Sequence, residues 1–151
     1  MIRYLTGNIM DSSAEAFVNT VNTVGVMGKG IALQFKIEFP QNYAVYRDAC
    51  LKHNLQIGQL LTVADSSLLL GNRLIINFPT KTHWRLPSEY RYVEKGLQAL
   101  DELITKKEIK SVALPALGCG NGGLDWLLVK EMICRYLEPL DIVIEVYEPN
   151  R

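Results

Sequence analysis

The chain has 151 residues, of which 48% are hydrophobic and 21% charged, and this suits one globular domain with a sizeable core. Its formal net charge of zero gives no whole-surface attraction to nucleic acid or a membrane, and no apolar run approaches the roughly 18 residues of a membrane span. The three cysteines lack C-x-x-C spacing and there are only two histidines, so we expect reduced thiols and no metal site. The sequence shows no signal-peptide pattern, and we expect a cytoplasmic protein without a membrane partner.

Apolar runs rich in β-branched residues have the pattern of strands covered on both faces. They span residues 2–5, 16–21, 60–64, 74–78, 111–115 and 142–147. Helical patterns lie between them, over 30–39, 42–54, the segment after Pro87-Ser88 that carries Val93, Leu97, Leu100 and Ile104, and 125–137 with Asp125 as a possible N-cap. This alternation predicts a three-layer α/β/α domain around a central mixed sheet of about six strands, with ligands at the carboxyl ends of the strands.

The first loop whose residues suit ligand binding is NTVNTVGVMGKG, residues 19–30, which is followed directly by a predicted helix. Backbone N–H groups and the positive end of that helix would face a docked anion. Asn22 can donate and accept hydrogen bonds, as recognition of sugar hydroxyls requires. The alternative is a turn that only needs glycines at positive φ, and the spacing, which is neither Walker A nor GxGxxG, leaves both open.

The second loop is PALGCGNGGLDW, residues 115–126, which has four glycines in six residues. Without side chains the backbone amides can approach an anion closely, and a helix begins just beyond, so the loop suits a pyrophosphate. A flexible connector is the alternative, but ordering so many glycines is costly unless something binds them.

The third loop is NFPTKTHWR, residues 77–85, where an apolar run ends in a proline. A loop lysine is usually a solvated charge, but Pro79 and Trp84 predict a shaped, partly apolar setting for Lys81. Desolvation, or a nearby cation such as Arg85, would make this lysine nucleophilic. His83 could be a structural hydrogen-bonding residue or a general base, and Trp84 is interpreted as a loop anchor or stacking platform.

Together these segments resemble the macrodomain family of ADP-ribose-binding and ADP-ribosyl-hydrolysing proteins over essentially the whole chain. LTGNI (5–9) is similar to the family's opening strand and its turn towards adenosine, VNTVN (18–22) to its VNAAN-type segment, and ALPALGCGNGG (113–123) to its phosphate-binding loop. NTVNTVGVMGKGIALQFKIEFP and NFPTKTHWR most resemble the DarG-type antitoxin macrodomains and the related terminal ADP-ribose protein glycohydrolase, whose active-site lysine is matched by Lys81.

The resemblance implies a hydrolase of N-glycosidic bonds that removes ADP-ribose from DNA bases, reverses a DarT-type toxin and needs no cofactor. Lys81 would be catalytic, either as an amine that captures the anomeric carbon or as a cation that stabilises the leaving group. The implied substrate-binding residues are Asn8, Ile9, Asn22, Gly28, Gly30, Thr80, His83, Gly118, Cys119, Gly120, Asn121, Gly122 and Gly123. Trp84 and Arg85 are the implied DNA contacts, because aromatic and guanidinium planes stack on unpaired bases.

Two positions depart from the family pattern. Asn8 stands where many macrodomains have an aspartate that grips the adenine amino group, so adenine recognition would depend on backbone amides near Ile9. The aspartate of the terminal glycohydrolase falls on Gly122 in an ungapped comparison, and Asp125 comes three residues later. Asp125 could be an acid–base partner or a helix cap, and we favour the cap.

Other functions stay open at this point. The chain could hydrolyse protein-linked ADP-ribose or O-acetyl-ADP-ribose, or it could be a reader module that binds ADP-ribose without turnover. The modified base could be thymidine or guanosine. We expect residues 1–151 to form a single, monomeric macrodomain that could be the N-terminal part of a longer antitoxin. Its expected partners are ADP-ribose, ADP-ribosylated single-stranded DNA and a DarT-type toxin.

Overall fold

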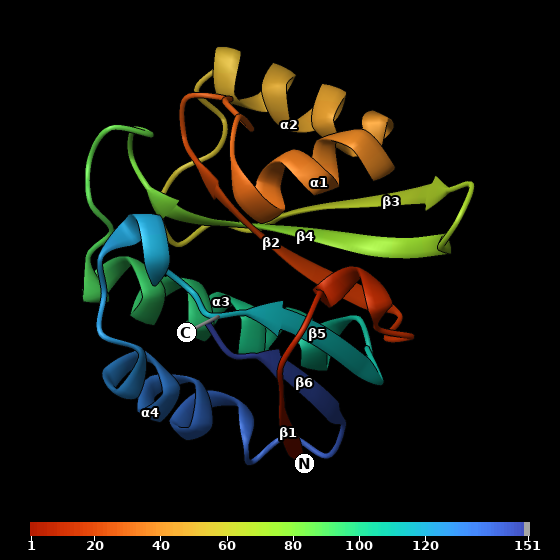
Figure 1. The fold of residues 1–151 in the computed structure, drawn as a ribbon, viewed down its shortest axis with the longest axis vertical. Helices are drawn as coiled ribbons and strands as arrows, with labels where there is room; N and C mark the ends of the chain where they lie inside the picture. Colours follow the sequence, from red (N-terminus) through yellow and green to blue (C-terminus); the bar gives the residue numbers. More distant parts are fainter. Residues whose placement is uncertain (150–151) are drawn as a thin grey trace.

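The computed structural model describes residues 1–149, in which six strands form one mixed sheet. The strands are β1 (Ile2–Leu5), β2 (Ala16–Asn22), β3 (Leu61–Ser67), β4 (Gly71–Lys81), β5 (Ser111–Pro115) and β6 (Val143–Tyr147). Their spatial order is β1-β6-β5-β2-β4-β3, and β3 runs antiparallel to β4 while the other neighbours are parallel. The carboxyl ends of β2, β4 and β5 therefore reach the same edge of the sheet, on the left in Figure 1.

The helices form a layer on each face of this sheet (Figure 1). They are α1 (Gly30–Glu38), α2 (Pro40–Leu51), α3 (Tyr90–Lys106) and α4 (Trp126–Leu137), with short 3-10 turns at Ile9–Asp11 and Gly120–Gly122. The helices α1 and α2 cover one face and α3 and α4 the other, which confirms the predicted three-layer α/β/α architecture. Among residues 1–149, no helix has the length and apolar character needed to cross a membrane.

The core on the α3 and α4 side follows the helical periodicity of the sequence. The predicted stripe of α3 is buried, with Val93, Leu97 and Leu100 fully so, and packs against the sheet together with the inner face of α4. At Gly96 the helix lies so close to β4 that an added Cβ would be 2.1 Å from the ring of Phe78. The missing side chain therefore brings α3 directly onto the strand that ends in the predicted active-site lysine.

One prediction about a strand end is wrong. The run at 74–78 does not stop before the proline, because β4 continues through Pro79 to Lys81. Pro79 pairs with Val21 of β2 next to a register shift, and it lies beyond the last pair of β3 with β4, so that side of β4 is open. Strand edges and irregularities tolerate a residue without an N–H. Lys81 is consequently held by the sheet and is not carried on a free loop.

Candidate active site

Three segments at the carboxyl edge of the sheet are joined to one another by hydrogen bonds. We call them the β2 loop (residues 23–29), the β4 loop (82–89) and the β5 loop (116–125). Thr23 binds the end of β4, since its N–H donates to the Lys81 carbonyl at 3.2 Å and its hydroxyl to the Thr82 carbonyl at 2.9 Å. Ser88 N–H donates to the Gly122 carbonyl at 3.0 Å. The structure thus brings together the three segments that the sequence singled out.

Lys81 is the last residue of β4 and lies opposite Asn22 in the pairing with β2. Its side chain is half-buried, and Nζ donates to the Trp84 carbonyl at 3.3 Å. This distance is at the long end for an N–H···O hydrogen bond, so the amine can exchange that carbonyl for another partner at small cost. The sheet fixes the backbone of Lys81 while the tip of its side chain stays available.

The other large side chains of the β4 loop stack on each other. The ring centroids of His83 and Trp84 are 5.3 Å apart with planes at 28°, and the Arg85 guanidinium carbon is 4.6 Å from the Trp84 ring centroid. His83 Nδ1 accepts a hydrogen bond from Arg85 N–H at 3.0 Å, which favours its structural interpretation. Trp84 remains 44% exposed, so the stack offers a planar surface to a ligand.

The β5 loop needs its glycines for two different reasons. Gly118, Gly120 and Gly123 have positive φ values of 72°, 71° and 83°, a region that other residues avoid. Gly122 instead lies against the β4 loop, and an added Cβ would be 2.4 Å from Ser88 Oγ. Gly118 and Gly122 are buried, whereas Gly120 and Gly123 are exposed with nothing within 4 Å of an added Cβ, so the backbone is open to a phosphate at these two positions.

Cys119 lies within the same loop and is half-buried. Burial, with a smaller contribution from the negative charge of Asp125, raises the pKa of the Cys119 thiol to about 11. The group is therefore an uncharged thiol at neutral pH and adds no negative charge to the predicted phosphate site.

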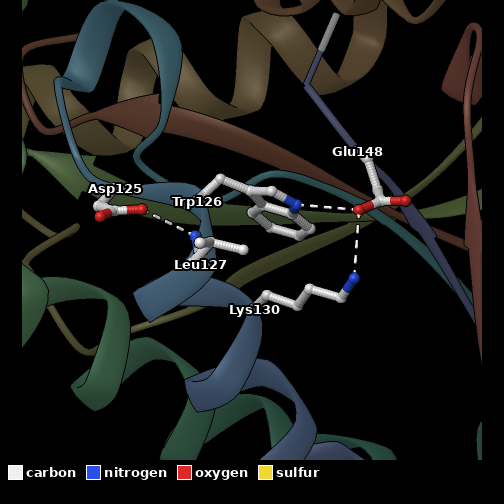
Figure 2. Close-up of polar contacts among 5 residues, drawn as sticks. All are labelled: Asp125, Trp126, Leu127, Lys130 and Glu148. Carbon is white, nitrogen blue, oxygen red and sulfur yellow. Dashed lines mark hydrogen bonds and ion pairs between the residues drawn. The ribbon is translucent and has the colours of Figure 1, made fainter.

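The start of α4 is pinned from two sides (Figure 2). Asp125 is the N-cap, because its Oδ1 accepts a hydrogen bond from Leu127 N–H at 2.9 Å, and this confirms the predicted cap. Trp126 Nε1 donates to Glu148 Oε2 at 3.0 Å, and Lys130 Nζ lies 3.4 Å from the same oxygen. Glu148 follows β6, so the sheet and the helix together fix the exit of the β5 loop.

Asn22 shapes the β2 loop from inside. Its side chain is buried, and Oδ1 accepts hydrogen bonds from the N–H groups of Val24, Gly25 and Val26 at 3.1, 3.1 and 3.3 Å. The Tyr46 hydroxyl of α2 lies 3.0 Å from the same oxygen and 2.7 Å from the Asn22 carbonyl. A contact between Asn22 and ribose stays a prediction, and it would require this amide to exchange one of these partners.

The predicted residues around the adenosine end differ in exposure. Asn8 is exposed, with Oδ1 accepting from Met10 N–H at 2.9 Å and Nδ2 donating to Gln34 Oε1 of α1 at 3.0 Å. Ile9 and Thr80 are buried and offer almost no side-chain surface, so a ligand would meet their backbone.

Two more predicted glycines lie where the β2 loop enters α1. Gly28 is exposed, and Gly30 begins the helix with a positive φ of 57°. The helix has no side-chain cap at Lys29, so the positive end of α1 is open to an anion.

Sequence reasoning missed three contacts that hold the site. Ser88 was interpreted only as the start of a helix, Tyr46 only as a member of a helical pattern, and Glu148 was not singled out. Each of these residues forms a hydrogen bond with a residue far away in the sequence: Ser88 with Gly122, Tyr46 with Asn22, and Glu148 with Trp126. The available signal was indirect: Tyr46 and Cys50 share the buried face of α2 at helical spacing.

Among residues 1–149, no group of three or more His, Cys, Asp or Glu side chains is placed to hold a metal ion. The three cysteines are free thiols, of which Cys50 is buried, Cys119 half-buried and Cys134 exposed.

The sequence matches one family model and several relatives that share a name. A family model described as Macro domain matches residues 18–133. The chain is 52% identical over 150 residues to a protein named DNA ADP-ribosyl glycohydrolase from Thermus aquaticus, a match that covers 99% of this chain and 41% of that relative. It is 46% identical over 151 residues to the protein of the same name from Mycobacterium tuberculosis, with 99% and 43% covered. The chain therefore spans about two fifths of the length of these relatives.

Solved structures agree with this grouping. The macrodomain of Mycobacterium tuberculosis DarG superposes with a TM-score of 0.94 at 46% identity and covers 99% of each chain. The structure named Thermosipho africanus DarTG in complex with ADP-ribose gives a TM-score of 0.92 at 40% identity, over 99% of this chain and 42% of that chain.

Proposed function

This chain belongs to the macrodomain family, and we propose that it is a DNA ADP-ribosyl glycohydrolase that removes ADP-ribose from modified DNA bases and reverses a DarT-type toxin. The observation that carries the proposal is the position of Lys81. It ends β4 at the point where the β2 and β4 loops are hydrogen-bonded to each other, and Ser88 joins the β4 loop to the β5 loop. The relatives that carry this name match the whole of this region.

The ligand in this proposal is ADP-ribose laid across the carboxyl ends of the strands. Its diphosphate meets the exposed backbone at Gly120 and Gly123 of the β5 loop and the uncapped start of α1, where backbone N–H groups and the helix dipole favour an anion. Its distal ribose lies against the β2 loop. Because Thr23 binds the Lys81 carbonyl, this placement brings the anomeric carbon to the end of β4.

Lys81 then acts at the anomeric carbon. The bond between this carbon and the base breaks with its electron pair leaving on the base, while the lone pair of the amine in its neutral form makes a carbon–nitrogen bond. The ammonium formed by this attack loses one proton, and the departing base gains one. Water then attacks the same carbon, the carbon–nitrogen bond breaks with its electron pair returning to Lys81, and a proton of the water restores the amine. The weak hydrogen bond of Nζ to the Trp84 carbonyl is the contact that the amine gives up to make this attack.

The exposed stack of the β4 loop favours DNA as the carrier of the ADP-ribose. Trp84 and Arg85 lie three and four residues beyond Lys81 and present aromatic and guanidinium planes, which stack on unpaired bases regardless of sequence.

A substrate panel tests this function. ADP-ribosylated single-stranded DNA, a peptide with ADP-ribose on glutamate, and O-acetyl-ADP-ribose are incubated separately with the protein, and released ADP-ribose is quantified. We expect kcat/KM to be highest for the DNA by at least about tenfold, a difference of about 1.4 kcal/mol in transition-state binding. Preference for the peptide would contradict the DNA specificity, and calorimetric binding without release from any substrate would instead show a reader module.

A further inference from the structure

A hollow adjoins the β2 loop of the proposed active site. It has a volume of about 430 Å³ and is formed between this loop and the helices α1 and α2. Its lining includes Val24, Val26 and Gly28 of the loop, Lys36 of α1, and Tyr43 and Arg47 of α2. The β2 loop lies directly on α2, since an added Cβ at Gly25 would be 3.3 Å from Cys50, and Figure 1 shows this loop next to both helices.

The hollow is positively charged although the protein as a whole is neutral. Lys36 and Arg47 are exposed, and neither forms an ion pair with any of residues 1–149. The adjacent Asp48 is already paired with Lys52 at 3.0 Å. The two cations of the hollow are therefore available to an anionic ligand, and no described acidic side chain neutralises them.

An aromatic ring and an apolar rim accompany these cations. Lys36 Nζ lies 4.6 Å from the ring centroid of Tyr43, which is half-buried in the wall of the hollow. Val24, Val26 and Leu51 are exposed around it. Cations that contact phosphates, together with an aromatic ring and apolar surface that receive a base, are the side chains used by proteins that bind single-stranded nucleic acid.

The β2 loop joins the hollow to the proposed active site. Thr23, at the start of this loop, hydrogen-bonds to the carbonyls of Lys81 and Thr82, and the next residues form the wall of the hollow. Only this short loop separates the positive hollow from the catalytic lysine. A strand whose modified base lies at Lys81 would pass over the loop and reach the hollow with its neighbouring nucleotides.

We propose that this hollow binds the single-stranded DNA that flanks the modified base, with backbone phosphates on Lys36 and Arg47 and a base against Tyr43. This inference rests on the proposed function, since it names a second part of the same substrate. It also explains how a protein without net charge holds DNA, because the attraction is local to the track that leads to the active site.

The test compares a Lys36→Ala/Arg47→Ala variant with a matched Lys106→Ala/Lys107→Ala variant, whose exposed lysines lie at the far end of α3. Binding of a fluorescent, unmodified oligonucleotide of about 12 nucleotides, within the roughly 4–16 nucleotides covered by single-strand sites, is followed by anisotropy. We expect about tenfold weaker binding for the first variant and wild-type binding for the second. The slope of log K against log salt should become shallower by about 1.4, since each phosphate contact contributes about 0.7.

A second readout separates this inference from the proposed function. We expect wild-type kcat/KM to be higher for an ADP-ribosylated oligonucleotide than for an ADP-ribosylated mononucleoside, and the Lys36→Ala/Arg47→Ala variant to lose this difference while keeping wild-type activity on the mononucleoside. Unchanged anisotropy in this variant, or no oligonucleotide binding by the wild type, would overturn the inference and leave the hollow to a protein partner. Failure to release ADP-ribose from any DNA, with the anisotropy difference intact, would overturn the proposed function alone.

Discussion

Gly122→Ala is expected to displace the β5 loop and weaken the binding of ADP-ribose. The new Cβ would be 2.4 Å from Ser88 Oγ and 3.0 Å from Ser88 Cβ. Rotation of the Ser88 hydroxyl relieves the first contact, but the second still forces the two loops apart by a few tenths of an ångström. Overpacking of this kind costs about 1–3 kcal/mol. If all of it appears in ligand binding, affinity falls by roughly 5- to 150-fold. Titration calorimetry with ADP-ribose measures this loss.

The structure also predicts a rescue. Ser88→Gly removes both clashing atoms, and because Ser88 Oγ is buried without a hydrogen-bond partner in the structure, its removal breaks no described hydrogen bond. The Gly122→Ala/Ser88→Gly variant should recover most of the affinity, whereas Ser88→Ala should recover less because its Cβ remains at 3.0 Å. Wild-type affinity for Gly122→Ala, or no recovery in the Ser88→Gly background, would refute the reasoning.

Three other variants or modifications follow from the contacts. Gly96→Ala should lower stability by about 1–3 kcal/mol in urea unfolding, because contact with the Phe78 ring at 2.1 Å outweighs the roughly 1 kcal/mol gained in helix propensity; higher stability would contradict this. Tyr46→Phe should lower stability by about 1–3 kcal/mol and weaken ADP-ribose binding in calorimetry, since the buried Asn22 acceptors lose a donor; unchanged values would exclude this anchor. Because the pKa of Cys119 is raised to about 11, its alkylation rate should climb about tenfold per pH unit up to that pH, and mass spectrometry showing a plateau near neutral pH would oppose it.

Local patterns in the sequence predicted much of the fold. The apolar stripe of α3 and the capping aspartate of α4 depend on residues within a few positions, and both are present. The predicted end of β4 was wrong because proline usually ends a strand, whereas Pro79 lies beyond the last residue of β4 that pairs with β3. Its missing N–H therefore breaks no hydrogen bond to β3. A sequence does not show where a neighbouring strand stops.

The candidate site was predicted in outline from its loops and from the family resemblance, but its internal support was not. Ser88 with Gly122, Tyr46 with Asn22, and Glu148 with Trp126 join positions between 22 and 34 residues apart. No periodicity or spacing connects such pairs, because they meet only after the sheet has aligned the strand ends. The predicted sugar contact of Asn22 shows the same limit, since a single sequence does not reveal that its amide is already engaged by the loop.

The chemical role of Lys81 is the central claim, and a comparison of Lys81→Ala, Lys81→Arg and the distant control Lys110→Ala tests it most directly. Release of ADP-ribose from modified single-stranded DNA is measured for each, alongside calorimetric binding of free ADP-ribose. We predict that both Lys81 variants lose activity by on the order of a hundredfold or more, while binding ADP-ribose within about twofold of the wild type, because arginine keeps the charge but cannot attack carbon. Substantial turnover by Lys81→Arg would show that residue 81 acts as a cation and not as a nucleophile. Undiminished turnover by Lys81→Ala would contradict any catalytic role of Lys81.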